Sequence, residues 1–195
     1  MRKLEFIYSG PLLLKLKVSN DDIVKIKKLC SKKKSLDWRK GLAGIIDNEY
    51  KIANLDQLSK ILTPYLDDFV YAHQKWYVGN PIKIKLRSAW VNYMVAGECN
   101  PLHIHDECNF SSVMYLNVPK DLKKESTSAI NNGTKPGEIA FYFHHFVDGF
   151  ITQHNSFPEV GDFYIFPALL PHAVTSFKSK GERISLACNF TTYYD

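Results

Sequence analysis

The sequence lacks any apolar stretch that approaches the roughly 18 residues of a membrane span. Its basic start resembles a secretory signal only briefly, because Ser9, Gly10, Pro11 and Lys15 interrupt the apolar run that follows. The four cysteines show no CxxC or other paired spacing, so neither a zinc motif nor a disulfide framework is indicated. These absences predict a cytoplasmic protein with reduced thiols and no membrane partner.

A strong charge of either sign is also missing. The 195 residues carry a formal net charge of +5, which is mild for this length and does not favour nucleic acid as a partner. Hydrophobic residues make up 45% and aromatic residues 13%, a composition typical of globular proteins. The length and the lack of an internal repeat predict a single domain over residues 1–195.

The chain changes character near residue 80. Before that point it reads as short strands and helices, with apolar residues at helical spacing and Ser19 or Asn20 as a helix cap. Pro64 interrupts the second helical pattern and predicts a kink or a break there. We expect strands at 3–8 and 12–18, a helix from 20 into the lysines at 32–34, a loop anchored by Trp38 at 35–53, and a helix at about 55–76.

From about residue 82, short strand-like runs follow one another with glycine and proline turns between them. Many short strands of this kind predict a sandwich or a barrel. The polar stretch 119–137 is expected to be a surface loop. We expect the strands at 82–95, 110–118, 138–143, 148–153, 161–166, 172–177 and 182–191.

Two histidines one residue apart, His103 and His105, lie between the first two of these runs. On extended backbone both imidazoles point to one face and can reach the same ion. A third histidine, His172, closes an apolar strand-like run. Two nitrogen ligands that are close in sequence and a distant third predict a metal site inside the barrel.

Arg183 lies in the strand-like run 182–191. A buried arginine in a barrel strand is costly unless it pairs with an anion. One hypothesis is a bidentate contact with the carboxylate of a substrate or cofactor. The other is an ion pair with an acidic residue at the barrel edge.

Five segments in this order resemble the Fe(II)- and 2-oxoglutarate-dependent oxygenases of the prolyl-hydroxylase type, closest to small oxygenases of marine bacteria and their phages. The resemblance covers residues 85–191 and implies a double-stranded β-helix, a cupin-like jelly roll at 81–195. The fold class is then mainly β, or α+β, with supporting N-terminal helices in 1–80. The segments are WVN at 90–92, HIH at 103–105, SSVMYLNVP at 111–119, GDFYIFPALLPH at 161–172 and RISLACNF at 183–190.

The resemblance implies Fe(II) and 2-oxoglutarate as cofactors and O2 as co-substrate, in the cytoplasm of the cell or, for a phage protein, of its host. His103 and His172 match iron ligands of the family. Arg183 matches the residue that binds the far carboxylate of 2-oxoglutarate. The hydroxyl groups that match helpers of that contact belong to Ser185, Tyr115 and Tyr93.

The sequence departs from the family at one ligand. The usual triad has a carboxylate two residues after the first histidine, and here that position is His105. Three hypotheses remain: His105 binds the metal, Asp106 or Glu107 supplies the carboxylate, or two protein ligands suffice with water. Because three neutral ligands would change the charge of the site, zinc or manganese also stays open.

The function implied is hydroxylation of an unidentified substrate, with a prolyl or other peptidyl side chain and a small molecule both open. Two other functions remain: a cupin-type metalloenzyme that does not use 2-oxoglutarate, and a non-catalytic jelly-roll binding module. Fold analogy is a weak guide to substrate. The sequence also leaves open a homodimer through the N-terminal helices.

Overall fold

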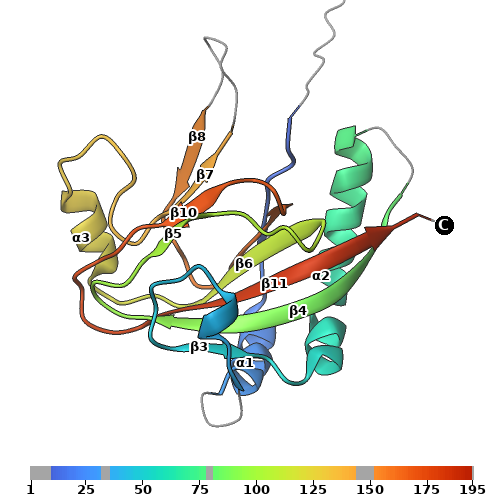
Figure 1. The fold of residues 1–195 in the computed structure, drawn as a ribbon, viewed down its shortest axis with the longest axis horizontal. Coiled ribbons are helices and arrows are strands. Elements are labelled where there is room, and N and C mark those ends of the chain that lie inside the picture. The colour runs from blue at the N-terminus through green and yellow to red at the C-terminus, as the bar shows by residue number, and fades with distance from the viewer. Residues whose placement is uncertain (1–9, 32–35, 78–80, 144–151, 195) are drawn as a thin grey trace, which may run out of the picture.

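The computed structural model describes residues 10–31, 36–77, 81–143 and 152–194. Two antiparallel sheets form the body of the protein, and helices α1 (Asn20–Leu29) and α2 (Leu55–Tyr77) pack on the larger one (Figure 1). The expected strand at 3–8, the lysines at 32–34 and most of the expected strand at 148–153 lie outside the described residues.

The larger sheet has seven strands in the order β1-β9-β6-β11-β4-β3-β2. β11 lies in its middle and pairs with β4 on one side and β6 on the other. All its pairings are antiparallel. Its strands are β1 (Leu14–Lys17), β2 (Leu36–Asp37), β3 (Glu49–Lys51), β4 (Lys83–Met94), β6 (Phe110–Asn117), β9 (Asp162–Pro167) and β11 (Arg183–Tyr193).

The smaller sheet has four strands in the order β5-β10-β7-β8. Together the two sheets make the predicted jelly roll, a mainly β architecture with few helices (Figure 1). The strands of the smaller sheet are β5 (Asn100–His103), β7 (Ile139–Tyr142), β8 (Gln153–Ser156) and β10 (His172–Val174).

Two segments expected to be loops contain regular structure. Part of the expected loop 35–53 forms β2, a short 3-10 helix η2 (Arg39–Gly41) and β3, which extends the larger sheet beyond β4. The expected loop 119–137 contains helix α3 (Leu122–Ser128), which buries Leu122 and Ser126. Both corrections have one cause: tertiary pairing and packing stabilise elements too short to show a sequence period.

The two long helices follow their sequence signals closely. The Ser19 side chain caps α1 by accepting a hydrogen bond from the backbone N–H of Asp22 at 3.2 Å. α2 runs unbroken across Pro64, so the expected break is not found. Among the described residues, no helix combines the length and the apolar character of a membrane span. α2 buries one apolar stripe, made of Leu58, Leu62, Leu66 and Phe69.

The hydrophobic residues form two cores, one on each face of the larger sheet. Leu62, Val91 and Leu186 belong to the core between this sheet and the helices. Met94 and Phe166 belong to the core between the two sheets. Because successive strand residues point to opposite faces, each central strand supplies both cores. The side between the sheets is where the histidines lie.

Candidate metal centre and adjoining pockets

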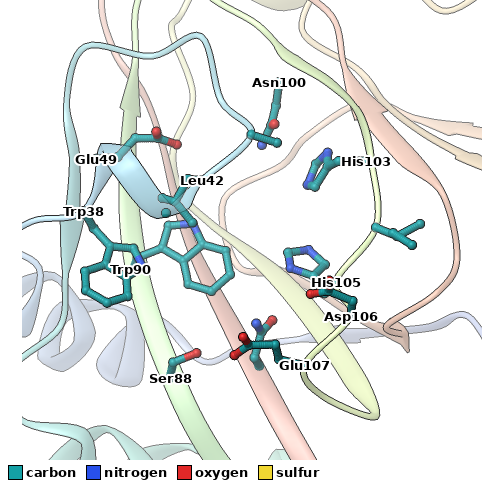
Figure 2. Close-up of a pocket in the computed structure, with 14 residues that line it drawn as sticks. Trp38, Leu42, Glu49, Ser88, Trp90, Asn100, His103, His105, Asp106 and Glu107 are labelled. Carbon is teal, nitrogen blue, oxygen red and sulfur yellow. The ribbon is translucent and has the colours of Figure 1, made fainter.

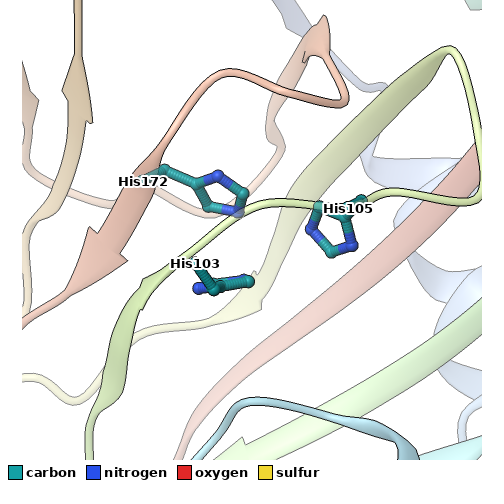
Figure 3. Close-up of side chains that lie close together, drawn as sticks. All are labelled: His103, His105 and His172. Atoms are coloured by element: carbon teal, nitrogen blue, oxygen red, sulfur yellow. The ribbon is translucent and has the colours of Figure 1, made fainter.

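Three histidines meet between the two sheets (Figure 3). His103 ends β5, and its partner across the smaller sheet is His172, the first residue of β10. His105 lies just beyond β5, where its backbone N–H donates a 2.9 Å hydrogen bond to the carbonyl of Ala168. The ring centroids of His103 and His172 are 4.2 Å apart, and that of His105 is 5.2 Å from each.

One ring nitrogen from each histidine lies within 4.8 Å of the other two. This spacing suits a single bound ion, and imidazole is a good ligand for iron, zinc, copper and nickel. Within the described ranges, no other cluster of three or more His, Cys, Asp or Glu side chains has this spacing. The geometry predicted from the His-x-His pattern and the distant histidine is therefore present.

Backbone carbonyls orient two of the three rings. Nδ1 of His103 lies 2.7 Å from the carbonyl oxygen of Pro101, and Nδ1 of His172 lies 2.9 Å from that of Leu170. A carbonyl oxygen only accepts, so Nδ1 carries the proton in both rings. The Nε2 lone pair of each ring is then left to bind a metal.

All three imidazoles are held neutral. Burial is the main cause that lowers the pKa of His103, and it lowers the pKa of His105 to about 4 and that of His172 to about 3. The neighbouring His103 adds to the effect on the other two, because like charges repel. Near neutral pH the three ring nitrogens therefore need not lose a proton before they bind a metal.

The two carboxylates that follow the His-x-His lie elsewhere. Asp106 and Glu107 are exposed and do not belong to the histidine group. Arg87 donates to a side-chain oxygen of Glu107 at 3.0 Å and also to its backbone carbonyl. Of the three ligand hypotheses, this arrangement favours the one in which His105 supplies the third donor.

Arg183 begins β11 and is 2% exposed. Its Nη1 donates to the carbonyl of Gly137 at 3.1 Å, whereas its Nε has no hydrogen-bond partner. Burial lowers the pKa of Arg183, which the nearby Tyr115 partly opposes. Among the described residues no carboxylate forms an ion pair with it. A buried guanidinium without an anion is the feature expected of an anion-binding site.

Two of the three predicted hydroxyl residues lie near Arg183. Tyr115 is completely buried, and its hydroxyl oxygen has no hydrogen-bond partner. Ser185 is the register partner of both Tyr115 and Asn92 in the larger sheet. Arg183 and Ser185 line a small cavity of about 30 Å³ together with all three histidines and Asn92. Since this space is the size of one water, a dicarboxylic acid enters only if lining side chains move.

Tyr93 does not share this site. It lies in the core between the larger sheet and the helices, and its hydroxyl donates to the carbonyl of Cys30. The prediction for Tyr93 is wrong, because Tyr93 lies on the face of β4 that packs against the helices. Successive residues of a strand point to opposite faces, so Asn92, not Tyr93, reaches the cavity.

A larger pocket of about 440 Å³ adjoins His103 and His105 (Figure 2). His103 and His105 line both cavities, as do Trp90 and Asn100. The remaining walls come from the segment around η2, from β3, β4 and β11, and from the residues that follow β5. These walls include Trp38, Leu42, Ala43, Glu49 and Ser88.

Glu49 is the main residue that sequence reasoning missed. It is 1% exposed, and neither carboxylate oxygen has a hydrogen-bond partner. Burial, and next the charge of Glu98, raise the pKa of Glu49 to about 7. Glu49 is the first residue of β3, which has only three residues. A strand of this length is too short to show the alternation that would have indicated a buried position for Glu49.

The chain matches a family model described as "Putative 2OG-Fe(II) oxygenase" over residues 88–189. A Pseudomonas putida prolyl-4-hydroxylase is 15% identical with a TM-score of 0.59, covering 92% of this chain and 91% of that one. A viral collagen prolyl hydroxylase from Paramecium Bursaria Chlorella virus-1, solved with 2-oxoglutarate, is 14% identical with a TM-score of 0.56, covering 93% and 96%.

HygX from Streptomyces hygroscopicus, solved with nickel, 2-oxoglutarate and hygromycin B, is 13% identical with a TM-score of 0.54, covering 93% of this chain and 82% of that one. A comparison with curated protein sequences gave no match. At these identities the solved structures establish the double-stranded β-helix fold, whereas the family model spans more than half of the chain. This chain therefore belongs to the 2OG-Fe(II) oxygenase family and is a dioxygenase that uses Fe(II) and 2-oxoglutarate.

Proposed function

We propose that this protein hydroxylates a C–H bond of a substrate held in the larger pocket, beside iron bound by His103, His105 and His172. A peptidyl side chain, prolyl or other, and a small molecule are the two substrate classes considered. The observation that carries the proposal is the shared face: three neutral imidazoles and a buried, anion-free arginine line one cavity. The donor set fits a divalent metal of this family, since each imidazole offers one lone pair.

The chain's own residues would divide the work of binding. Arg183 would pair with the far carboxylate of 2-oxoglutarate, and the unpartnered hydroxyl of Tyr115 would donate to the same group. Ser185, in register with Tyr115, would assist that contact. When bound, iron and 2-oxoglutarate supply the oxidising chemistry, and the protein supplies orientation and exclusion of water.

The wall of the larger pocket would position the substrate. Trp90 is 5% exposed and its ring centroid lies 5.8 Å from that of His105. A substrate that packs against Trp90 is thereby held next to the metal ligands. The 440 Å³ of this pocket lies within the range of small-molecule sites.

Anaerobic titration of the Fe(II)-loaded protein with 2-oxoglutarate tests this proposal. We expect a weak visible charge-transfer band in the wild type, a much weaker band in Arg183→Met, and an unchanged band in Arg39→Met. Arg39 is the matched control, because it is an exposed arginine paired with Asp37. If iron binds but the wild type shows no band, the proposal fails and a metalloenzyme that does not use 2-oxoglutarate replaces it.

A further inference from the structure

Glu49 is a buried acid that the proposed function leaves without a role. It lies on β3, opposite Asn92 of β4. Neither of its carboxylate oxygens has a hydrogen-bond partner, and no ion pair to it is found in the described part of the chain. Figure 2 shows its side chain extending from β3 toward the side of the pocket on which His103 lies.

An ionised carboxylate in this position destabilises the folded protein. Removing an ionised group from water without a partner raises the free energy of the folded state, and the raised pKa of Glu49 expresses that cost. The charged groups that act on it are Glu98 and Asp37, which raise this pKa, and Arg39, which lowers it. None of them forms a contact with it. A positively charged group on a bound ligand would remove this free-energy cost.

The rest of the pocket suits a cation. No lysine or arginine is among the described residues that line it, although the whole chain carries a net charge of +5. Asp106 adds a second carboxylate to the lining, and Glu107 adds a third that is already paired with Arg87. Trp90 supplies an aromatic ring whose face attracts an ammonium or guanidinium group, whereas the Trp38 ring already has the Nζ of Lys51 4.2 Å from its centroid.

Two arginines beside the pocket already form ion pairs with other carboxylates. Arg39 forms an ion pair with Asp37, its Nη2 lying 2.7 Å from the carboxylate. Arg87 pairs with Glu107 at 3.0 Å. Neither pairs with Glu49, and within the described part of the chain no cationic side chain forms an ion pair with its carboxylate.

The position of Glu49 also separates the substrate from the cofactor. Glu49 lines the larger pocket and not the smaller one, whereas Arg183 lines the smaller pocket and not the larger. Its carboxylate is outside the group of ligand atoms that the three histidines form. A charge at this position therefore acts on what enters the larger pocket.

We propose that the substrate carries a protonated nitrogen, an ammonium or guanidinium group, which pairs with Glu49 while its carbon chain packs along Trp90 toward the histidines. This inference rests on the proposed function, because it names the substrate class of the same site. The same chemistry belongs to a basic peptide side chain and to a free polyamine.

Isothermal titration of the metal-free protein tests the recognition step without any turnover. The probes are Nα-acetyl-lysine methylamide, Nα-acetyl-norleucine methylamide as its neutral counterpart, Nα-acetyl-glutamate methylamide, and putrescine. A hydrogen-bonded charge pair is expected to favour the lysine probe over the norleucine probe by about 10- to 100-fold. Preference for putrescine over the lysine probe identifies a free amine, and the reverse identifies a peptide side chain.

Glu49→Gln is expected to abolish the preference for the lysine probe, whereas Glu159→Gln keeps it. Glu159 is the matched control, since it is an exposed acid near Lys17 and Lys123. Equal binding of the lysine and norleucine probes to the wild type overturns the inference, and this comparison does not depend on the variant folding. Loss of the 2-oxoglutarate band in Glu49→Gln also overturns it, because Glu49 would then balance the charge of the cofactor site.

The failure of the proposed function gives a different result. In that case Fe(II)-loaded wild type shows no charge-transfer band with 2-oxoglutarate, whatever the probes do. If the band forms and the lysine probe raises succinate production while the norleucine probe does not, both proposals are supported together.

Discussion

The guanidinium carbon of Arg183 lies 5.5 Å from the centroid of the Tyr115 ring. The two side chains are buried side by side, one with an unpartnered Nε and the other with an unpartnered hydroxyl. The ring face offers the guanidinium partial compensation through a cation–π contact. Arg183 Nε and the Tyr115 hydroxyl are two hydrogen-bond donors without acceptors. A ligand that satisfies both needs at least two acceptor oxygens and a negative charge.

Replacing Arg183 by methionine separates binding from stability. We expect the affinity for 2-oxoglutarate to fall by at least about 10- to 100-fold, because hydrogen bonds to a charged group are lost. Thermal stability of the metal-free protein should be unchanged or higher, because an unpaired buried charge is removed. Anaerobic titration and a melting curve measure the two effects. A variant that loses stability and affinity together contradicts this account.

Removing the hydroxyl group from Tyr93 and from Tyr115 is expected to have opposite effects on stability and on 2-oxoglutarate affinity. Tyr93→Phe removes the hydrogen bond to the carbonyl of Cys30 and should cost about 1 kcal/mol of stability, with no change in 2-oxoglutarate affinity. Tyr115→Phe removes a hydroxyl without a partner, so it should leave stability intact and weaken 2-oxoglutarate binding. Denaturant unfolding and the charge-transfer titration distinguish them. A loss of affinity in Tyr93→Phe would restore that residue to the site.

His105 is the position where this chain departs from the two-histidine, one-carboxylate triad of non-haem Fe(II) oxygenases. If it donates to the metal, His105→Ala should lower Fe(II) affinity by at least about 10- to 100-fold, the cost known for residues that only support a ligand. His105→Asp should keep most of the affinity, because it restores the two-histidine, one-carboxylate arrangement. Competition with a chelator under anaerobic conditions gives both values. Unchanged affinity in His105→Ala would leave only His103 and His172 as ligands.

Glu49 should make stability depend on pH in a defined direction. Its pKa is raised to about 7 in the folded protein, so the folded state holds the proton more tightly than the unfolded chain does. The contribution of Glu49 to stability is therefore expected to be lost as the pH rises from about 4.5 through 7, while the three histidines, whose pKa values are lowered, act in the opposite direction. Relative to wild type, metal-free Glu49→Gln should melt higher at pH 8 than at pH 5, by about 3 °C or more.

The control for this pH effect is again Glu159→Gln, whose side chain is exposed. Its melting temperature should follow that of the wild type at both pH values. The three histidines titrate in the same way in all three proteins, so their contribution cancels in the differences. A constant offset between Glu49→Gln and wild type at pH 5 and pH 8 would show that Glu49 keeps one protonation state across this range, which contradicts a pKa near 7.

The sequence predicts the metal centre better than the pockets around it. His103, His105 and His172 could be found because a spacing of two on a strand and a matching family pattern agree. Tyr93 was misplaced because β4 buries both of its faces, so hydrophobicity does not reveal which residues point toward the cavity. Glu49 escaped notice because β3 has three residues and exists only by pairing with β4.

The helices show the same division. α2 was predicted from a period sustained over its whole length, and Pro64 did not break it. α3 has seven residues and was predicted as loop, because so short a helix is stable only through packing of residues such as Leu122. Long periodic elements are thus visible in the sequence, whereas elements formed by contacts with distant segments are not.

The middle strand of the larger sheet, β11, comes after both of its neighbours in the chain. During translation, β4 and β6 are therefore synthesised before β11, the strand that pairs with both of them. All three histidines are synthesised before Arg183 and Ser185, so the candidate metal ligands exist before these two residues of β11 do. If Arg183 binds 2-oxoglutarate as proposed, this cofactor is bound only after β11 has been synthesised and has paired with β4 and β6.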